Sequence, residues 1–219
     1  MANWTAYGDW MRFAYLDGSG PSLKASFTAA YKITDEPETW SNRFVKFKAK
    51  DEASIKRAIA LMKFAVQPLL KRLDVDSSKT IFLPALSSEE TKASSSGALA
   101  RLAAECANCS KAAWSYHALT KNAHRPLHTL KTAAARSAEL VLADYKAHKV
   151  TGSYNHFFII DDFITRGETL SCAAAAIVKL QANAIVYGLA LGKTERKSYN
   201  SAVSNDHVPG SFSDAWKSV

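Results

Sequence analysis

The chain has 219 residues, of which 47% are hydrophobic and 22% charged, which is ordinary composition for a globular protein of one elaborated domain or two small ones. Its apolar runs are too short to span a bilayer, and its first residues lack the basic segment and apolar stretch of a secretory signal, so we expect a cytoplasmic protein with no membrane partner. The formal net charge of +8 favours polyanionic partners such as phosphorylated sugars, nucleic acid or acidic membranes, without choosing among them.

The first forty residues are rich in Trp and Tyr and carry a turn signal at 17–21. They predict short strands or irregular structure around aromatic side chains. We therefore expect an aromatic-rich N-terminal elaboration over 1–42, one domain over 43–194 and a polar tail over 195–219.

Within the expected domain, short apolar runs alternate with segments of near-helical apolar spacing. Strands are expected at 43–48, 80–84 and 112–119, in the run that begins at Phe157, and at 184–191; helices are expected at 53–73, 97–106 and 130–145 and in the Ala-rich segment after Thr169. This alternation predicts an α/β fold with a mostly parallel sheet flanked by helices. In such folds, ligands bind at the carboxyl ends of the strands.

One of these strand-to-helix junctions has the residues of a phosphate site. The apolar run from Phe157 ends in two adjacent carboxylates, Asp161 and Asp162. A short turn with Gly167 and two threonines then leads into the helical segment. The first amides of a helix have no internal partners and favour anions, and a glycine lets the backbone approach an oxyanion closely. The carboxylates can accept hydrogen bonds from sugar hydroxyls or help to hold a divalent cation. Together these features predict a ribose 5-phosphate site.

This stretch resembles the diphosphoribosyl-binding signature of the type I phosphoribosyltransferases. The family pattern is four apolar residues, two acidic residues, two apolar residues and then Thr-x-Gly-x-Thr, and it is matched at every fixed position of 157–169. The signal is specific because the pattern is long and mixes residue types. An ordinary buried strand ending in a capped helix is the alternative, although adjacent aspartates are a poor choice for a cap.

The resemblance implies roles for residues in three segments. The 5-phosphate would be held by Thr165, Arg166, Gly167, Glu168 and Thr169; the catalytic residues would be Asp161, Asp162, Lys121 and Arg125; and the pyrophosphate loop would include Leu86, Ser87, Ser88 and Lys92. Magnesium would bridge the pyrophosphate oxygens, with Asp161 or Asp162 completing the arrangement. The implied reaction joins an unknown acceptor to carbon 1 of phosphoribosyl pyrophosphate and releases pyrophosphate.

The order of elements also resembles the ComF-type, competence-associated branch of that family. The strand at 80–86 takes the place of a Val-Pro-Val-Pro-Leu-like strand, 119–128 follows as the flexible loop, and Arg136 is a match for an arginine of the next helix. The branch usually begins with a cysteine zinc ribbon, whereas this chain has no cysteine before Cys106.

Two carboxylates, Glu89 and Glu90, depart from the basic or small residues that the family commonly has in its first loop. They would repel pyrophosphate unless magnesium or Lys92 intervened. A non-catalytic sensor of phosphoribosyl ligands, or an interaction module associated with DNA, is therefore the rival hypothesis to a transferase. A homo-oligomer is compatible with either.

The pair Cys106-x-x-Cys109 resembles half of a zinc site. No second pair completes it, and an isolated pair in an Ala-rich segment is more often incidental.

Overall fold

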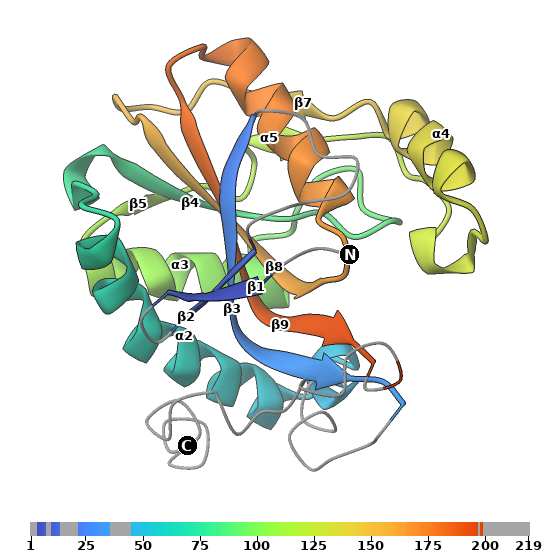
Figure 1. Ribbon diagram of the computed structural model, residues 1–219. Helices are drawn as coiled ribbons and strands as arrows, with labels where there is room; N and C mark the ends of the chain where they lie inside the picture. Colours follow the sequence, from blue (N-terminus) through green and yellow to red (C-terminus); the bar gives the residue numbers. More distant parts are fainter. Residues whose placement is uncertain (1–3, 8–9, 14–21, 36–44, 197, 199–219) are drawn as a thin grey trace.

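The computed structural model describes residues 4–7, 10–13, 22–35, 45–196 and 198. In these residues a seven-stranded sheet runs in the order β1-β2-β3-β9-β8-β4-β5 (Figure 1). The strands are β1 Trp4–Tyr7, β2 Trp10–Phe13, β3 Leu23–Ile33, β4 Thr80–Pro84, β5 Ala113–Trp114, β8 His156–Ile164 and β9 Ile185–Glu195. The five strands from β3 to β5 pair in parallel, and β1 and β2 pair antiparallel at one edge. The expected α/β class with a mostly parallel sheet is confirmed.

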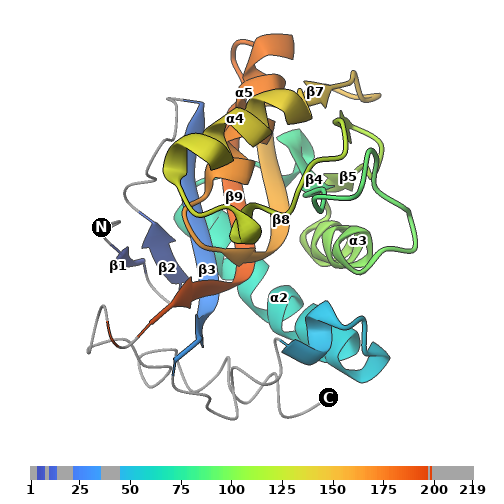
Figure 2. The same ribbon diagram turned by 90° about the vertical axis from the view of Figure 1, so that its right-hand side faces the viewer.

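Helices cover both faces of this sheet (Figures 1 and 2). Helices α2 (Glu52–Arg72) and α3 (Ala98–Ser110) share one apolar core with the sheet, and α5 (Glu168–Leu180) shares the other. A small second sheet, β6 (Leu119–Thr120) with β7 (Lys146–Ala147), and helix α4 (Ala133–Ala143) belong to the long connection between β5 and β8. None of the helices in the described ranges is long and apolar enough to cross a bilayer.

The alternation of side chains along the central strands builds these two cores. In β8, Phe157 and Ile159 face α5, whereas Phe158 and Ile160 face α2 and α3. The ring of Phe158 stacks between two aromatic rings, with centroids 5.2 Å from Phe82 and 4.9 Å from Tyr187. Three adjacent strands are joined at this stack, so it anchors the centre of the sheet.

Most expected elements lie within a few residues of the observed ones, and three expectations are wrong. Residues 45–48 form a helical turn instead of a strand, because the backbone reverses through Lys50 at φ 61° and only Phe47 is buried there. The single strand expected at 112–119 is two short strands, β5 and β6, in different sheets. Short strands or irregular structure were expected over the first forty residues, which is wrong for 23–33. Those residues form β3, an eleven-residue strand of the central sheet. The turn signal at 17–21 lies outside the described residues.

The aromatic stack gives a test of this arrangement. Phe158→Ala should lower the free energy of unfolding by about 3 to 5 kcal/mol, because it removes a fully buried ring and leaves a cavity. Urea denaturation measures this change. The matched control is Phe64→Ala, whose side chain is half exposed and should cost about 1 kcal/mol. Equal losses in the two variants would contradict the described core.

Candidate functional site

The candidate site begins where the chain diverges at the centre of the sheet. From β4 the chain goes through α3 to β5 on one side, and from the neighbouring β8 it goes through α5 to β9 on the other. The loops that follow β4 and β8 therefore leave in opposite directions from adjacent strand ends. This topological switch point is where open parallel sheets place their ligand crevice.

The two aspartates lie where β8 separates from β4. The last backbone bond between these strands runs from the Ala85 amide to the Ile160 carbonyl, at 2.7 Å, and β8 then continues alongside β9 as far as Ile164. The carboxylate of Asp161 accepts from the amide of Asp162 at 2.8 Å, and that of Asp162 accepts from the amide of Phe163 at 2.7 Å. Short carboxylate side chains thus satisfy backbone donors beyond the end of β4.

The neighbouring acids have different surroundings. Burial, followed by the charge of Asp162, raises the pKa of the Asp161 carboxyl. Asp162 instead lies 3.8 Å from the ammonium of Lys48. Asp161 therefore has the environment of a protonated hydrogen-bond donor, whereas Asp162 has a cation to balance its charge. Two adjacent carboxyl groups in such different surroundings can exchange hydrogen bonds with a pair of hydroxyls.

Sequence reasoning did not identify the cations that gather at this end of β8. The ammonium groups of Lys32 and Lys48 lie 4.5 and 5.3 Å from the centre of the Phe163 ring. Burial and then the charge of Lys48 lower the pKa of Lys32. Lys193 on β9 is also buried, and burial lowers its pKa, with Arg166 adding to the effect. These lysines come from β3, β9 and the turn at 45–48, and no sequence motif connects them.

The turn after β8 has a backbone conformation that favours glycine. Gly167 adopts φ 80° and ψ 8°, in the left-handed region, and is the N-cap of α5. A glycine has no side chain to cap the helix, so the first amides of α5 have no side-chain partner at the N-cap. Arg166, Glu168 and Thr169 are partly buried around it, and Thr165 is exposed.

The loop after β4 is closed on itself by Glu90. Its carboxylate accepts from the amide of Ser87 at 2.8 Å, and its own amide donates to the Ser87 carbonyl at 3.2 Å. The Ser87 amide, which could donate to an anionic ligand, therefore already donates to the carboxylate of Glu90. Glu89 is exposed, so the two acids of this loop have separate roles. Leu86 is buried at the start of the loop.

The segment at 120–125 is fastened to this loop by Lys121. Its ammonium donates to the Ser88 carbonyl at 2.9 Å and to the Asn122 carbonyl at 3.3 Å, and its amide donates to the Thr91 carbonyl at 3.0 Å. Burial lowers the pKa of Lys121 to about 8. Lys92 pairs with Thr120 beside it. In this conformation, Lys121 holds two loops together.

Arg125 fastens the same segment to α4. Its guanidinium donates to the carboxylate of Glu139 at 2.8 and 3.0 Å, and its amide donates to that carboxylate at 2.8 Å. These bonds lower the pKa of Glu139, which is buried. Arg125 itself is 71% exposed, so it remains accessible to a ligand while it is paired.

The oxygen ligands for a cation are few at this site. In the described part of the chain, no group of three or more His, Cys, Asp or Glu side chains could hold a metal ion. Asp161 and Asp162 fit magnesium only if a ligand supplies most of the oxygens, which is how magnesium commonly binds phosphates. Cys106, the first cysteine of the pair that resembles half of a zinc site, lies on α3 and is buried in the core that α3 shares with α2. Burial raises the pKa of its thiol.

No protein-family model matches this chain, and no curated protein matches its sequence. Function must therefore be argued from the site.

The raised pKa of Asp161 gives a pH-dependent prediction. A carboxyl whose pKa is higher in the folded than in the unfolded protein stabilises the fold at low pH, and that stability is lost as the pH rises through the folded-state pKa. Asp161→Asn should therefore stabilise the protein by about 1 kcal/mol at pH 8 and by less at pH 5. Thermal unfolding at both pH values measures this difference. The matched control is Asp144→Asn, at an exposed acid paired with Lys146, and equal changes in the two variants at both pH values would contradict the assignment.

Proposed function

We propose that the chain binds ribose 5-phosphate or phosphoribosyl pyrophosphate in the crevice between the ends of β4 and β8. The observation that carries this proposal is the match of 157–169 to the phosphoribosyl-binding pattern, at a topological switch point and with Gly167 in a left-handed conformation at the start of α5. A phosphate would accept from the first amides of α5, and ribose hydroxyls would meet Asp161 and Asp162.

The charges around the crevice support an anionic ligand. Lys32, Lys48 and Lys193 lie at or near the end of β8, while burial raises the pKa of Asp161. Reduced negative charge on Asp161 lowers the repulsion between this pair and a phosphate. The parallel sheet with helices on both faces is compatible with a type I phosphoribosyltransferase-like fold.

The proposed reaction is transfer of phosphoribosyl from phosphoribosyl pyrophosphate to an acceptor. The bond between carbon 1 and the pyrophosphate oxygen breaks, the acceptor forms a bond to the same carbon, and its proton leaves to solvent. The protein would mainly position the reactants and stabilise charge. Arg125 would contact the leaving pyrophosphate, and magnesium held by that group and Asp162 would neutralise it.

A non-catalytic sensor is the second candidate, and Glu90 is the observation that favours it. Its carboxylate accepts from the Ser87 amide in the loop where the pyrophosphate is expected. Lys121 is likewise bound to carbonyls of that loop and of its own segment. Both contacts must change if pyrophosphate is to use these donors. Pyrophosphate release from phosphoribosyl pyrophosphate, measured with magnesium and a panel of bases, distinguishes the two candidates: release identifies a transferase, and tight binding without release identifies a sensor.

Two glycines that open helices provide a matched test of the phosphate site. Gly167→Ala should weaken ribose 5-phosphate binding at least tenfold, because a Cβ at φ 80° strains the turn and shifts the first amides of α5. Gly97→Ala, at the N-cap of α3 with φ −63°, should leave binding unchanged. Isothermal calorimetry measures both affinities. Equal affinity in the wild type and Gly167→Ala would refute the assignment.

The two acids of the first loop test its closure. Glu90→Gln should tighten phosphoribosyl pyrophosphate about three- to tenfold relative to ribose 5-phosphate, because the Ser87 amide loses a charged acceptor. The effect should be larger at low salt, where screening is weaker. Glu89→Gln, at an exposed carboxylate, should change the ratio less than twofold. If both variants behave alike, the two acids act only through the general charge of the loop.

A further inference from the structure

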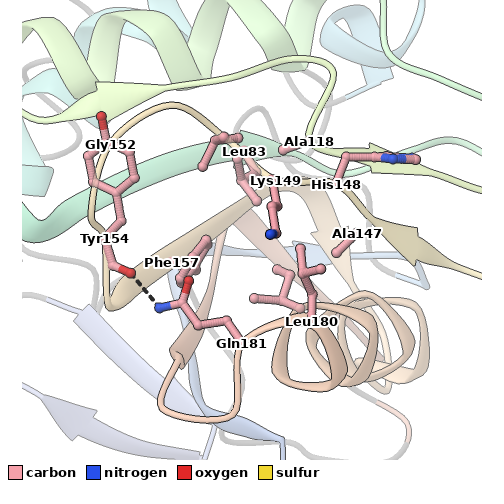
Figure 3. Close-up of a pocket in the computed structure, with 12 residues that line it drawn as sticks. Leu83, Ala118, Ala147, His148, Lys149, Gly152, Tyr154, Phe157, Leu180 and Gln181 are labelled. Carbon is pink, nitrogen blue, oxygen red and sulfur yellow. Dashed lines mark hydrogen bonds between the residues drawn. The ribbon is translucent and has the colours of Figure 1, made fainter.

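A cavity of about 240 Å³ lies on the α5 face of the sheet, away from the crevice (Figure 3). Its apolar surface includes Leu83 of β4, Phe157 of β8 and Leu180 at the end of α5. The connection from β7 to β8, residues 148–155, covers it. Phe157 is the second residue of β8, and Asp161 lies four residues further along, which is about 13 Å in a strand. The cavity is thus separate from the proposed phosphoribosyl site.

The wall that covers the cavity is held in one conformation. Gly152 has φ 118°, and a Cβ at this position would lie 2.5 Å from both the Cζ and the hydroxyl oxygen of Tyr154. The tyrosine ring can therefore lie against the backbone only where residue 152 is glycine. The side-chain amide of Gln181 donates to the Tyr154 carbonyl, and the His148 amide donates to the Ala118 carbonyl at 2.8 Å. These bonds tie the connection to α5 and to β6.

One cation lines this space at its mouth, where the Lys149 side chain is largely exposed to solvent. Figure 3 shows the ammonium of Lys149 among Leu83, Phe157 and Leu180, whereas the ring of His148 points away. The His148 ring is held by the Thr120 hydroxyl, with Nε2 and the oxygen 2.7 Å apart. Within the described ranges, Lys149 makes neither a hydrogen bond nor an ion pair with a side chain or carbonyl. Its charge is therefore available to an occupant.

The chemistry of the lining selects the kind of occupant. An apolar cavity of about 150 Å³ accommodates benzene, so about 240 Å³ has room for a ring or a branched chain with one polar group. A single ammonium balances a single carboxylate. A phosphorylated sugar carries several hydroxyls and a second charge, and Leu83 and Phe157 offer them no hydrogen-bond partners.

We propose that this cavity is a second ligand site, which binds a small monocarboxylate with a compact apolar body. The apolar body contacts Leu83, Phe157 and Leu180, and the carboxylate pairs with Lys149 at the mouth. This site stands on its own geometry and does not depend on the proposed phosphoribosyl function.

Benzoate and its neutral counterpart benzamide test the proposal by calorimetric titration of the full chain. Benzoate should bind the wild type with an affinity on the order of 1 mM, and about three- to fivefold tighter than benzamide. Lys149→Gln should remove this preference. The matched control is Lys146→Gln, at an exposed neighbour paired with Asp144, which should retain it.

A second variant tests the cavity itself. Ala147 lines the cavity from β7, and Ala147→Leu should fill part of the space and weaken both probes at least fivefold without lowering the thermal midpoint. The proposal is overturned if benzoate does not bind the wild type at about 10 mM, if benzamide binds as tightly as benzoate, or if Lys149→Gln keeps the preference.

Discussion

The end of pairing between β4 and β8 is the constraint on which the candidate site depends. The two strands are hydrogen-bonded as far as Pro84 and Ile160, and the chain then leaves them in opposite directions across the sheet. Because β8 continues to pair with β9 beyond Ile160, Asp161 and Asp162 remain in extended backbone. On their other side, the pairing with β4 has already ended. Because β4 and β8 are parallel, the loop after β4 and the N-terminus of α5 lie at the same end of the sheet. The divergence sends the two connections to opposite sides, which is the arrangement in which open parallel sheets place their ligands.

Charge at this end of the sheet is assembled from distant parts of the chain. Lys32 is on β3 and Lys193 is on β9, and both are partly or fully buried against the end of the sheet. Burying ammonium groups is unfavourable unless anions or polar groups compensate. The charge of Asp162 compensates in part for Lys32, and the ion pair with Glu195 does so for Lys193. An anionic ligand at this end of the sheet would add to this compensation.

The sequence was most informative where one residue type is required by local backbone geometry. Gly167 is in the left-handed region that the turn demands, and the apolar run from Phe157 is a buried strand. Prediction failed where tertiary contacts decide. Strand β3 buries the polar residues Ser26 and Thr28, so its sequence does not have the apolar pattern expected of a central strand. Ser26 fits there because the neighbouring residue of β9, Gly188, has no side chain. Lys121 was expected to be at a ligand, but its ammonium donates to the carbonyl of Ser88, 33 residues away, a contact that no local pattern encodes. That expected role, like the others inferred from the resemblance, stays a prediction.

The most direct test of the central claim is a titration of the isotope-labelled protein with ribose 5-phosphate, followed residue by residue through its backbone amide resonances. Binding in the proposed crevice should shift the amides of 161–163 and 165–170, because those groups meet the ribose and the phosphate. Amides of 148–155, at the separate cavity, should not shift. Shifts confined to other parts of the chain, or no shifts at millimolar ligand, would contradict the account.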